Sequence, residues 1–240
     1  MTATATPFIL SVTDSLKAHM IVLIVLILLP LAVIGVQLAL DLDSVMGVFG
    51  YSLYKVFLLV PPLIYCRAMG IGVYRDILKL PNWRRSLPAA AGLGGVAVVA
   101  FWGTYYLLSD LLLDKAMIVA KIGEQFSVTA STVFLIAPIT ILLNSLLEEF
   151  FYRGFAFGLL VKRQRWLGYL LPSTAFTIQH ILFIYHWVTP LPFAIAVGGL
   201  FVFALVLQQV YETAESIVAP WLIHVFGDIA MMGIAVTLLW

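Results

Sequence analysis

The chain has 240 residues, of which 63% are hydrophobic and 10% are charged, and its formal net charge at pH 7 is +1. Soluble globular domains are about 45–50% apolar and about 25% charged, so this composition excludes an ordinary soluble domain. A net charge near zero argues against a nucleic-acid partner, and a single cysteine, Cys66, excludes a disulfide framework and a CxxC metal site.

Hydropathy predicts an all-α, polytopic membrane helical bundle with about seven transmembrane helices, within a range of six to eight. Each span approaches or exceeds the ~20 apolar residues that cross a bilayer. The predicted spans, in chain order, are residues 20–40, 48–66, 87–108, 131–161, 167–186, 191–208 and 216–240.

The segment at residues 109–130 is amphipathic, and we expect it to lie on the membrane interface or to form a tilted half-helix. We therefore divide the chain into two parts. Residues 1–130 hold the N-terminal membrane helices and this segment. Residues 131–240 form a catalytic membrane domain from the last four helices.

Lysine and arginine cluster in the loops at residues 67–85 and 162–165, which lie on the same side as Lys17 if the helix count is odd. Cytoplasmic loops carry this excess of basic residues, so the N-terminus is predicted to be cytoplasmic and the C-terminus external. The expected location is a bacterial plasma membrane, with the lipid bilayer as the surroundings. The sequence specifies no oligomeric state.

Ionisable side chains within the predicted spans are concentrated in the second half of the chain. Such residues are costly in a membrane and usually mark a functional site. These residues are Glu148, Glu149, Arg153, His180, His224 and Asp228. Counted from the cytoplasmic flank of each helix, Glu148, His180, His224 and Asp228 lie 9 to 14 residues inside, a depth of roughly 13 to 21 Å at about 1.5 Å per residue. We expect the polar groups of these helices to meet in one cavity near the membrane middle.

The two adjacent glutamates are predicted to have different roles. Asn144 and Glu148 are four residues apart and share one helix face. Glu149 is turned by about 100° from Glu148, and it precedes Arg153 by four residues, the favourable order for an ion pair. Glu149 is therefore expected to be neutralised by Arg153, which leaves Glu148 facing the cavity.

A carboxylate and two imidazoles around one cavity suggest the activation of water. Glu148 with His180 can polarise a water molecule for attack on a peptide carbonyl, while His224 with Asp228 stabilises the oxyanion. The same Glu148, His180 and His224 could instead bind Zn²⁺, since two histidines and a glutamate form a known catalytic ligand set. The motifs HExxH and CxxC are absent, which favours a metal-free site with Zn²⁺ as the alternative.

Three short motifs occur in order on three separate predicted helices. "EEFFYR" at 148–153 fits EExxxR, "FTIQH" at 176–180 fits FxxxH, and "HVFGD" at 224–228 fits HxxxN/D. Through these motifs the chain resembles the CAAX protease and bacteriocin-processing family, which includes the type II CAAX prenyl endopeptidases and the Abi proteins. The resemblance covers roughly residues 130–235.

The resemblance implies an intramembrane endopeptidase whose site opens to the cytosolic side. Glu148 and His180 would activate water, and His224 and Asp228 would contact the oxyanion. The substrate would be a membrane-associated protein or peptide of CAAX or bacteriocin type. Prenyl endopeptidases commonly have Asn where this chain has Asp228, which weakens a specific claim of prenyl-protein processing. Residues expected to support the site are Asn144, Glu149, Arg153 and Phe176.

A metalloprotease label is common in this family, although a glutamate-dependent mechanism without metal also fits it. Two further interpretations are weighed beside a protease. A non-catalytic member could act as a membrane scaffold, a sensor or a bacteriocin-immunity protein. A transporter is disfavoured because the chain shows no internal repeat.

Overall fold

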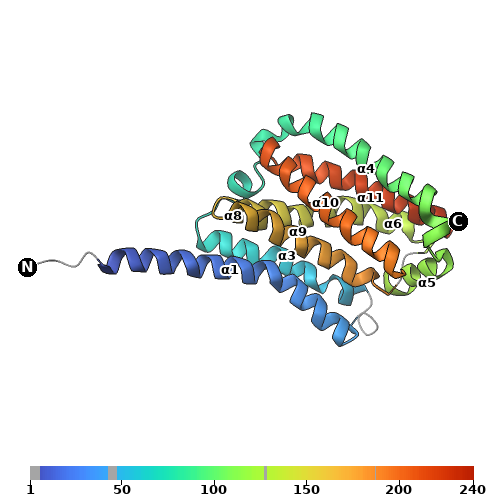
Figure 1. Cartoon of the computed structure of the whole chain (residues 1–240), viewed down its shortest axis with the longest axis horizontal. Coiled ribbons are helices and arrows are strands. Elements are labelled where there is room, and N and C mark those ends of the chain that lie inside the picture. The colour runs from blue at the N-terminus through green and yellow to red at the C-terminus, as the bar shows by residue number, and fades with distance from the viewer. Residues whose placement is uncertain (1–5, 43–47, 127–128, 187) are drawn as a thin grey trace, which may run out of the picture.

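The structure is a computed structural model that describes residues 6–42, 48–126, 129–186 and 188–240. Every regular element within these ranges is a helix, which confirms the all-α prediction. Figure 1 shows the start of α1 and the C-terminus at opposite ends of an elongated bundle, with the first turns of α1 extending beyond the other helices. The longer helices are α1 (Thr6–Ala39), α3 (Val48–Ala68), α4 (Trp83–Leu112), α5 (Lys115–Phe126), α9 (Arg165–Ile184), α10 (Pro190–Ala214) and α11 (Val218–Leu239).

Six helical stretches of the described residues are long and apolar enough to cross a membrane, which lies within the predicted range of six to eight. The predicted span at 48–66 is not among the six, although it is helical as α3 and packs along α1. The amphipathic segment at 109–130 divides between the end of α4 and the short helix α5. The six stretches are Lys17–Ala39, Leu80–Leu111, Val133–Leu160, Arg165–Ile184, Pro190–Ala214 and Val218–Leu239.

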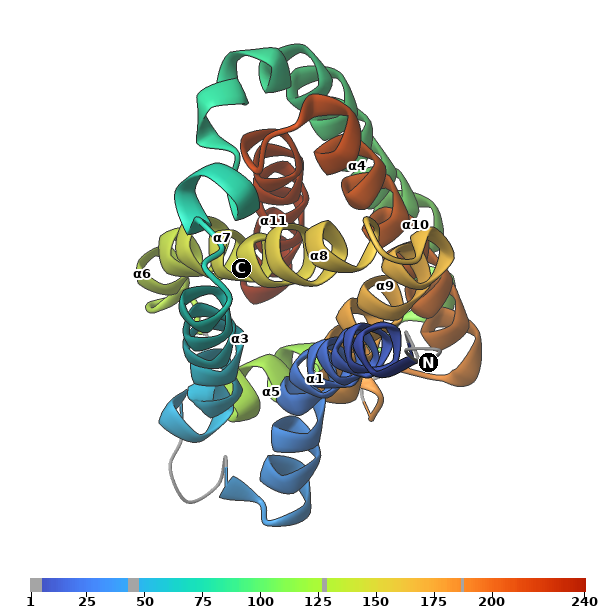
Figure 2. The same cartoon turned by 90° about the vertical axis from the view of Figure 1, so that its left-hand side faces the viewer.

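One stretch, Val133–Leu160, runs obliquely through the middle of the bundle (Figure 2). The pair α1 and α3 lies on one side of it, and the pair α4 and α11 lies on the other. Its central part contacts α3, α9, α10 and α11. Because it is enclosed by these helices, all residues of Phe150–Phe157 are buried. The EExxxR motif therefore lies at the centre of the molecule.

This central stretch is not the single regular α-helix that hydropathy predicts. Two π-helical segments, η3 (Ile139–Asn144) and η4 (Phe150–Phe157), flank the short helix α7 (Ser145–Glu149); α6 (Val133–Pro138) and α8 (Gly158–Leu160) complete it. The N–H of Ser145 donates to the carbonyl of Thr140, five residues earlier, while the Ser145 hydroxyl donates to the carbonyl of Ile141. A hydroxyl that takes a main-chain acceptor competes with the regular helical bond. Such π-helical turns are frequent at functional sites.

The loop between α3 and α4 folds back onto the bundle as the π-turn η1 (Val73–Ile77) and the 3₁₀ turn η2 (Leu80–Asn82). The hydroxyl of Tyr211 donates to the carbonyl of Ile77 over 2.6 Å. Gly154 allows this approach, because a Cβ there would lie 2.7 Å from Cγ2 of Ile77 and 3.2 Å from its carbonyl oxygen. The loop is thus seated directly on the helix that carries the EExxxR motif.

Replacing Gly154 by Ala should destabilise the protein, although alanine is the better helix former by up to ~1 kcal/mol. The added methyl group overpacks the contact with Ile77, which costs about 1–3 kcal/mol. Thermal unfolding in detergent measures the effect. Gly198→Ala on α10 is the control, since its Cβ would meet nothing within 4 Å. A Gly154→Ala midpoint at or above that of Gly198→Ala would contradict this packing.

Candidate active site

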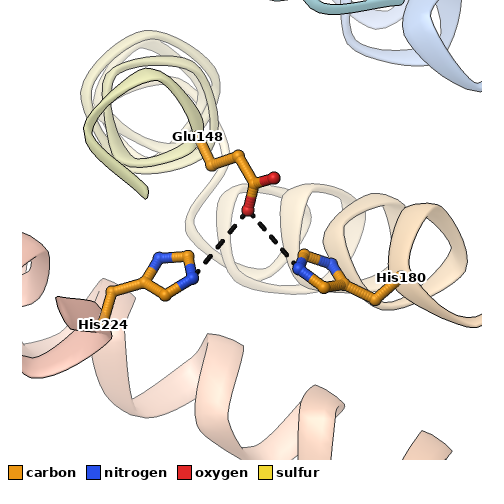
Figure 3. Close-up of side chains that lie close together, drawn as sticks. All are labelled: Glu148, His180 and His224. Atoms are coloured by element: carbon orange, nitrogen blue, oxygen red, sulfur yellow. Dashed lines mark ion pairs between the residues drawn. The ribbon is translucent and has the colours of Figure 1, made fainter. Parts of the chain in front are cut away.

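The side chains of Glu148, His180 and His224 come from α7, α9 and α11 and point toward one another (Figure 3). Oε2 of Glu148 lies 3.4 Å from Nε2 of His180 and 3.9 Å from Nε2 of His224. The Glu148 side chain is only 2% exposed. The structure therefore brings together the carboxylate and the two imidazoles that the sequence places on separate helices.

His180 lies on the more open side of this group, with its side chain 28% exposed. Its Nδ1 is 2.8 Å from the carbonyl oxygen of Phe176, one turn earlier on α9. A carbonyl oxygen can only accept, so Nδ1 carries the proton and Nε2 presents a lone pair toward Glu148. The spacing of the FxxxH motif thus fixes the tautomer as well as the position of the ring.

Phe176 is the aromatic centre of the site. Its ring centroid lies 4.2 Å from that of His180 and 5.7 Å from that of His224. The guanidinium carbon of Arg153 lies 4.3 Å from the same centroid, a cation–π distance. The expected supporting residue is therefore in contact with three charged or titratable side chains.

His224 lies beside two carboxylates, that of Asp228, which the sequence pairs with it, and that of Glu149. Its Nδ1 lies 2.8 Å from Oε1 of Glu149, while Oδ1 of Asp228 lies 3.7 Å from Nε2. The sequence pairs His224 with Asp228 by their spacing on one helix. In the structure α11 packs against α7, so Glu149 provides the hydrogen bond and Asp228 flanks the nitrogen that faces Glu148.

The predicted ion pair between Glu149 and Arg153 is confirmed. Nη1 of Arg153 lies 3.0 Å from Oε1 of Glu149, and both side chains are fully buried. The same Oε1 receives His224. Glu149 is therefore more than a neutralised neighbour, because it joins the guanidinium to the imidazole of the site.

Sequence reasoning missed two residues that contact the central carboxylate. Oε1 of Glu148 accepts hydrogen bonds from Asn144 (2.9 Å) and from Nε2 of Gln179 (3.0 Å). The hydroxyl of Tyr152 donates to Oε1 of Gln179 over 2.6 Å. Two signals could have revealed them. Gln179 is a polar residue within a predicted span beside His180, and Tyr152 extends the stripe of Asn144 and Glu148 by four residues.

The donor atoms of the site also fit a metal ion. Glu148, His180 and His224 offer ligand atoms that all lie within 4.8 Å of one another. These are residue types that bind Zn²⁺ at about 2.0–2.2 Å. Each histidine has a hydrogen-bond partner at Nδ1, as zinc-ligating histidines usually do. The arrangement can thus hold either a water molecule or a Zn²⁺ ion.

Comparisons with known proteins agree with the motifs. Residues 130–230 match a family model described as type II CAAX prenyl endopeptidase Rce1-like. No curated protein and no solved structure matches the chain. The matched segment contains every side chain of the candidate site, from Asn144 to Asp228. The resemblance that the three motifs indicate is confirmed for this part of the chain.

Replacing Arg153 by Met should destabilise the fold by about 3–5 kcal/mol, because it takes the paired guanidinium away from the buried Glu149 carboxylate. The double variant Glu149→Gln, Arg153→Met should recover much of that loss, since neither charge remains. Unfolding in detergent measures both.

Arg165→Met is the matched control. Arg165 pairs with Glu212 at the start of α9, where its side chain is 64% exposed, so the expected loss is at most about 1 kcal/mol. Equal losses of stability in Arg153→Met and Arg165→Met would show that the buried ion pair stabilises the fold no more than the exposed one.

Proposed function

We propose that this chain, whose residues 130–230 match the Rce1-like type II CAAX prenyl endopeptidase family model, hydrolyses a peptide bond with water activated by Glu148 and His180. At the level of the family it is a CAAX-type intramembrane endopeptidase, and its substrate is membrane-associated. One observation supports the proposal most strongly. Oε2 of Glu148 is buried, accepts no hydrogen bond from the described residues, and lies between Nε2 of His180 and Nε2 of His224.

The first step uses the two acceptors that face each other. Nε2 of His180 and Oε2 of Glu148 lie 3.4 Å apart, and both have lone pairs to offer. A water molecule can donate one O–H to each of them and direct its own lone pair at the carbonyl carbon of the substrate. As the C–O bond forms, the proton passes to Glu148, which acts as the general base.

The second step needs a donor for the oxyanion and a proton for the leaving group. His224 is flanked by Glu149 at Nδ1 and by Asp228 at Nε2, an arrangement that favours the imidazolium form. Nε2–H of His224 would then donate to the oxyanion. When the C–N bond breaks, the proton on Glu148 passes to the leaving amine, which restores the carboxylate.

A bound Zn²⁺ is the alternative. Its ligands would be Glu148, His180 and His224, with Phe176 and Glu149 orienting the two rings through Nδ1. Zn²⁺ would act as a Lewis acid and would lower the pKa of a bound water. The two mechanisms require different forms of His224, since a ligand needs an unprotonated Nε2 and an oxyanion donor needs a protonated one.

The expected location of this integral membrane protein is the plasma membrane of a bacterium, with the N-terminus in the cytoplasm. The basic loops around residues 67–85 and 162–165 lie at the end of the bundle where α1 begins (Figure 1). This distribution of basic residues supports the proposed orientation.

Glu148→Gln and His180→Ala should each reduce cleavage at least about 100-fold, because each variant removes one partner of the attacking water. Both variants should still insert into the membrane and should keep the unfolding midpoint of the wild type. Cleavage can be followed with a fluorogenic farnesylated peptide ending in a CAAX sequence, beside its unprenylated counterpart. The matched controls are Glu124→Gln and His186→Ala, which lie outside the site. Full activity in both site variants would exclude the proposed chemistry.

The same variants test the second candidate, a non-catalytic scaffold, sensor or immunity protein. That candidate is favoured if Glu148→Gln preserves the cellular phenotype of the wild-type chain. Comparing membrane peptides from cells with wild-type protein and with Glu148→Ala would reveal natural substrates. A set of peptides found only with the wild type would exclude the non-catalytic candidate.

Treatment with 1,10-phenanthroline, followed by removal of the chelator, should leave peptidase activity unchanged, because the proposed mechanism uses Glu148, His180 and protonated His224 and needs no metal ion. Elemental analysis of the purified protein provides the parallel measurement of zinc. Activity that falls with the zinc content and returns with added Zn²⁺ would favour the metal mechanism instead.

A further inference from the structure

We infer that Gln179 and Tyr152 are positioning residues that fix the carboxylate of Glu148, so that Oε1 is held and Oε2 is the oxygen that exchanges the proton. This inference rests on the proposed function, in which Glu148 is the general base. It assigns roles to two side chains at variable positions of the motifs, Tyr152 in EExxxR and Gln179 in FxxxH.

Hydrogen-bond chemistry determines which group donates in each of the two contacts, Tyr152 to Gln179 and Gln179 to Glu148. An ionised carboxylate can only accept, so the amide nitrogen of Gln179 must face Glu148. The amide oxygen of Gln179 then faces Tyr152, whose hydroxyl must donate to it. Tyr152 thus prevents the Gln179 amide from turning its oxygen toward the carboxylate, which would place two acceptors in contact.

Burial makes this arrangement rigid. Tyr152 is fully buried, and Gln179 and Glu148 are each 1% exposed. The Tyr152 ring packs edge-to-face on Phe151 and Phe176, with centroid distances of 4.9 Å and 5.3 Å. Because the ring cannot move away, its hydroxyl provides a fixed point for the amide. The contacts also cross between η4, α9 and α7, so the geometry of the carboxylate depends on how these helices pack.

The two oxygens of Glu148 are therefore chemically different. Oε1 accepts from both Asn144 and Gln179, whereas Oε2 accepts from no described residue and faces the two histidines. A proton taken from water is consequently received at Oε2, where the leaving amine can collect it. Loss of Gln179 would remove one of the two donors to Oε1 and would weaken this selection without removing any group that touches the substrate.

The test uses Gln179→Met and Tyr152→Phe, which remove the polar atoms and keep most of the volume. Gln179→Met should lower kcat roughly 10- to 100-fold, as loss of a supporting hydrogen bond typically does, with little change in KM. Tyr152→Phe should lower kcat less. The double variant should be no worse than Gln179→Met, because Tyr152 acts through Gln179. Additive losses would overturn the inference.

A second tyrosine–glutamine pair provides the matched control. The hydroxyl oxygen of Tyr169 lies 2.8 Å from Oε1 of Gln209 and 2.6 Å from Oε2 of Glu212, outside the site. Gln209→Met and Tyr169→Phe should leave kcat within about twofold of wild type. Should Gln179→Met fail to fold, the comparison of Tyr152→Phe with Tyr169→Phe still decides the question, and equal kcat values would contradict the assigned role.

An infrared measurement separates this inference from the proposed function, since it requires no turnover. The chain has five glutamates, so ¹³C-labelling of glutamate leaves few carboxylate bands, and Glu148→Gln identifies the one from Glu148. That band should shift in Gln179→Met and stay in place in Gln209→Met. If the Glu148 band shifts in Gln179→Met but the wild-type protein cleaves no peptide, the hydrogen bond from Gln179 stands and the proposed protease function is wrong. If the band does not shift and the wild-type protein is active, the protease function stands and the role of Gln179 is wrong.

Discussion

The rest of the site depends on the two contacts that a single oxygen atom, Oε1 of Glu149, makes with Arg153 and His224. It lies 3.0 Å from the Arg153 guanidinium and 2.8 Å from Nδ1 of His224, in a region where these side chains are almost completely buried. A carboxylate in such surroundings is tolerated only with partners of this kind. Because it contacts both the Arg153 guanidinium and the His224 imidazole, Glu149 connects the central helix to α11 and sets the position of His224.

The two neighbouring glutamates show how one helix can give the same functional group two roles. Glu149 binds its cation and its imidazole through one oxygen, whereas Glu148 is held by neutral amides through one oxygen and faces two histidines with the other. The Phe176 ring lies against Arg153 and both histidines. Electrostatic interactions are stronger in such a water-poor space than in solution.

The N-terminal half of the chain supports this centre from outside. Helix α3 contacts α7, and α4 packs along α11. Gly94 makes part of the second contact possible, because a Cβ there would lie 2.3 Å from the ring of Phe226. The helices that carry no motif thus hold in place those that carry the site. This arrangement explains why site residues so far apart in the sequence can share one small volume.

The sequence by itself determined the all-α membrane architecture, the three motifs and the Glu149–Arg153 pair, since hydropathy and i, i+4 spacing are local properties of a helix. It also indicated that Glu148, His180 and His224 would lie at one depth. Only the tertiary structure decided that Glu149 rather than Asp228 contacts Nδ1 of His224, and that Gln179 and Tyr152 hold Glu148. The reason is physical, because these contacts cross between helices, and their partners depend on rotation and packing, including two π-helical turns that hydropathy does not detect.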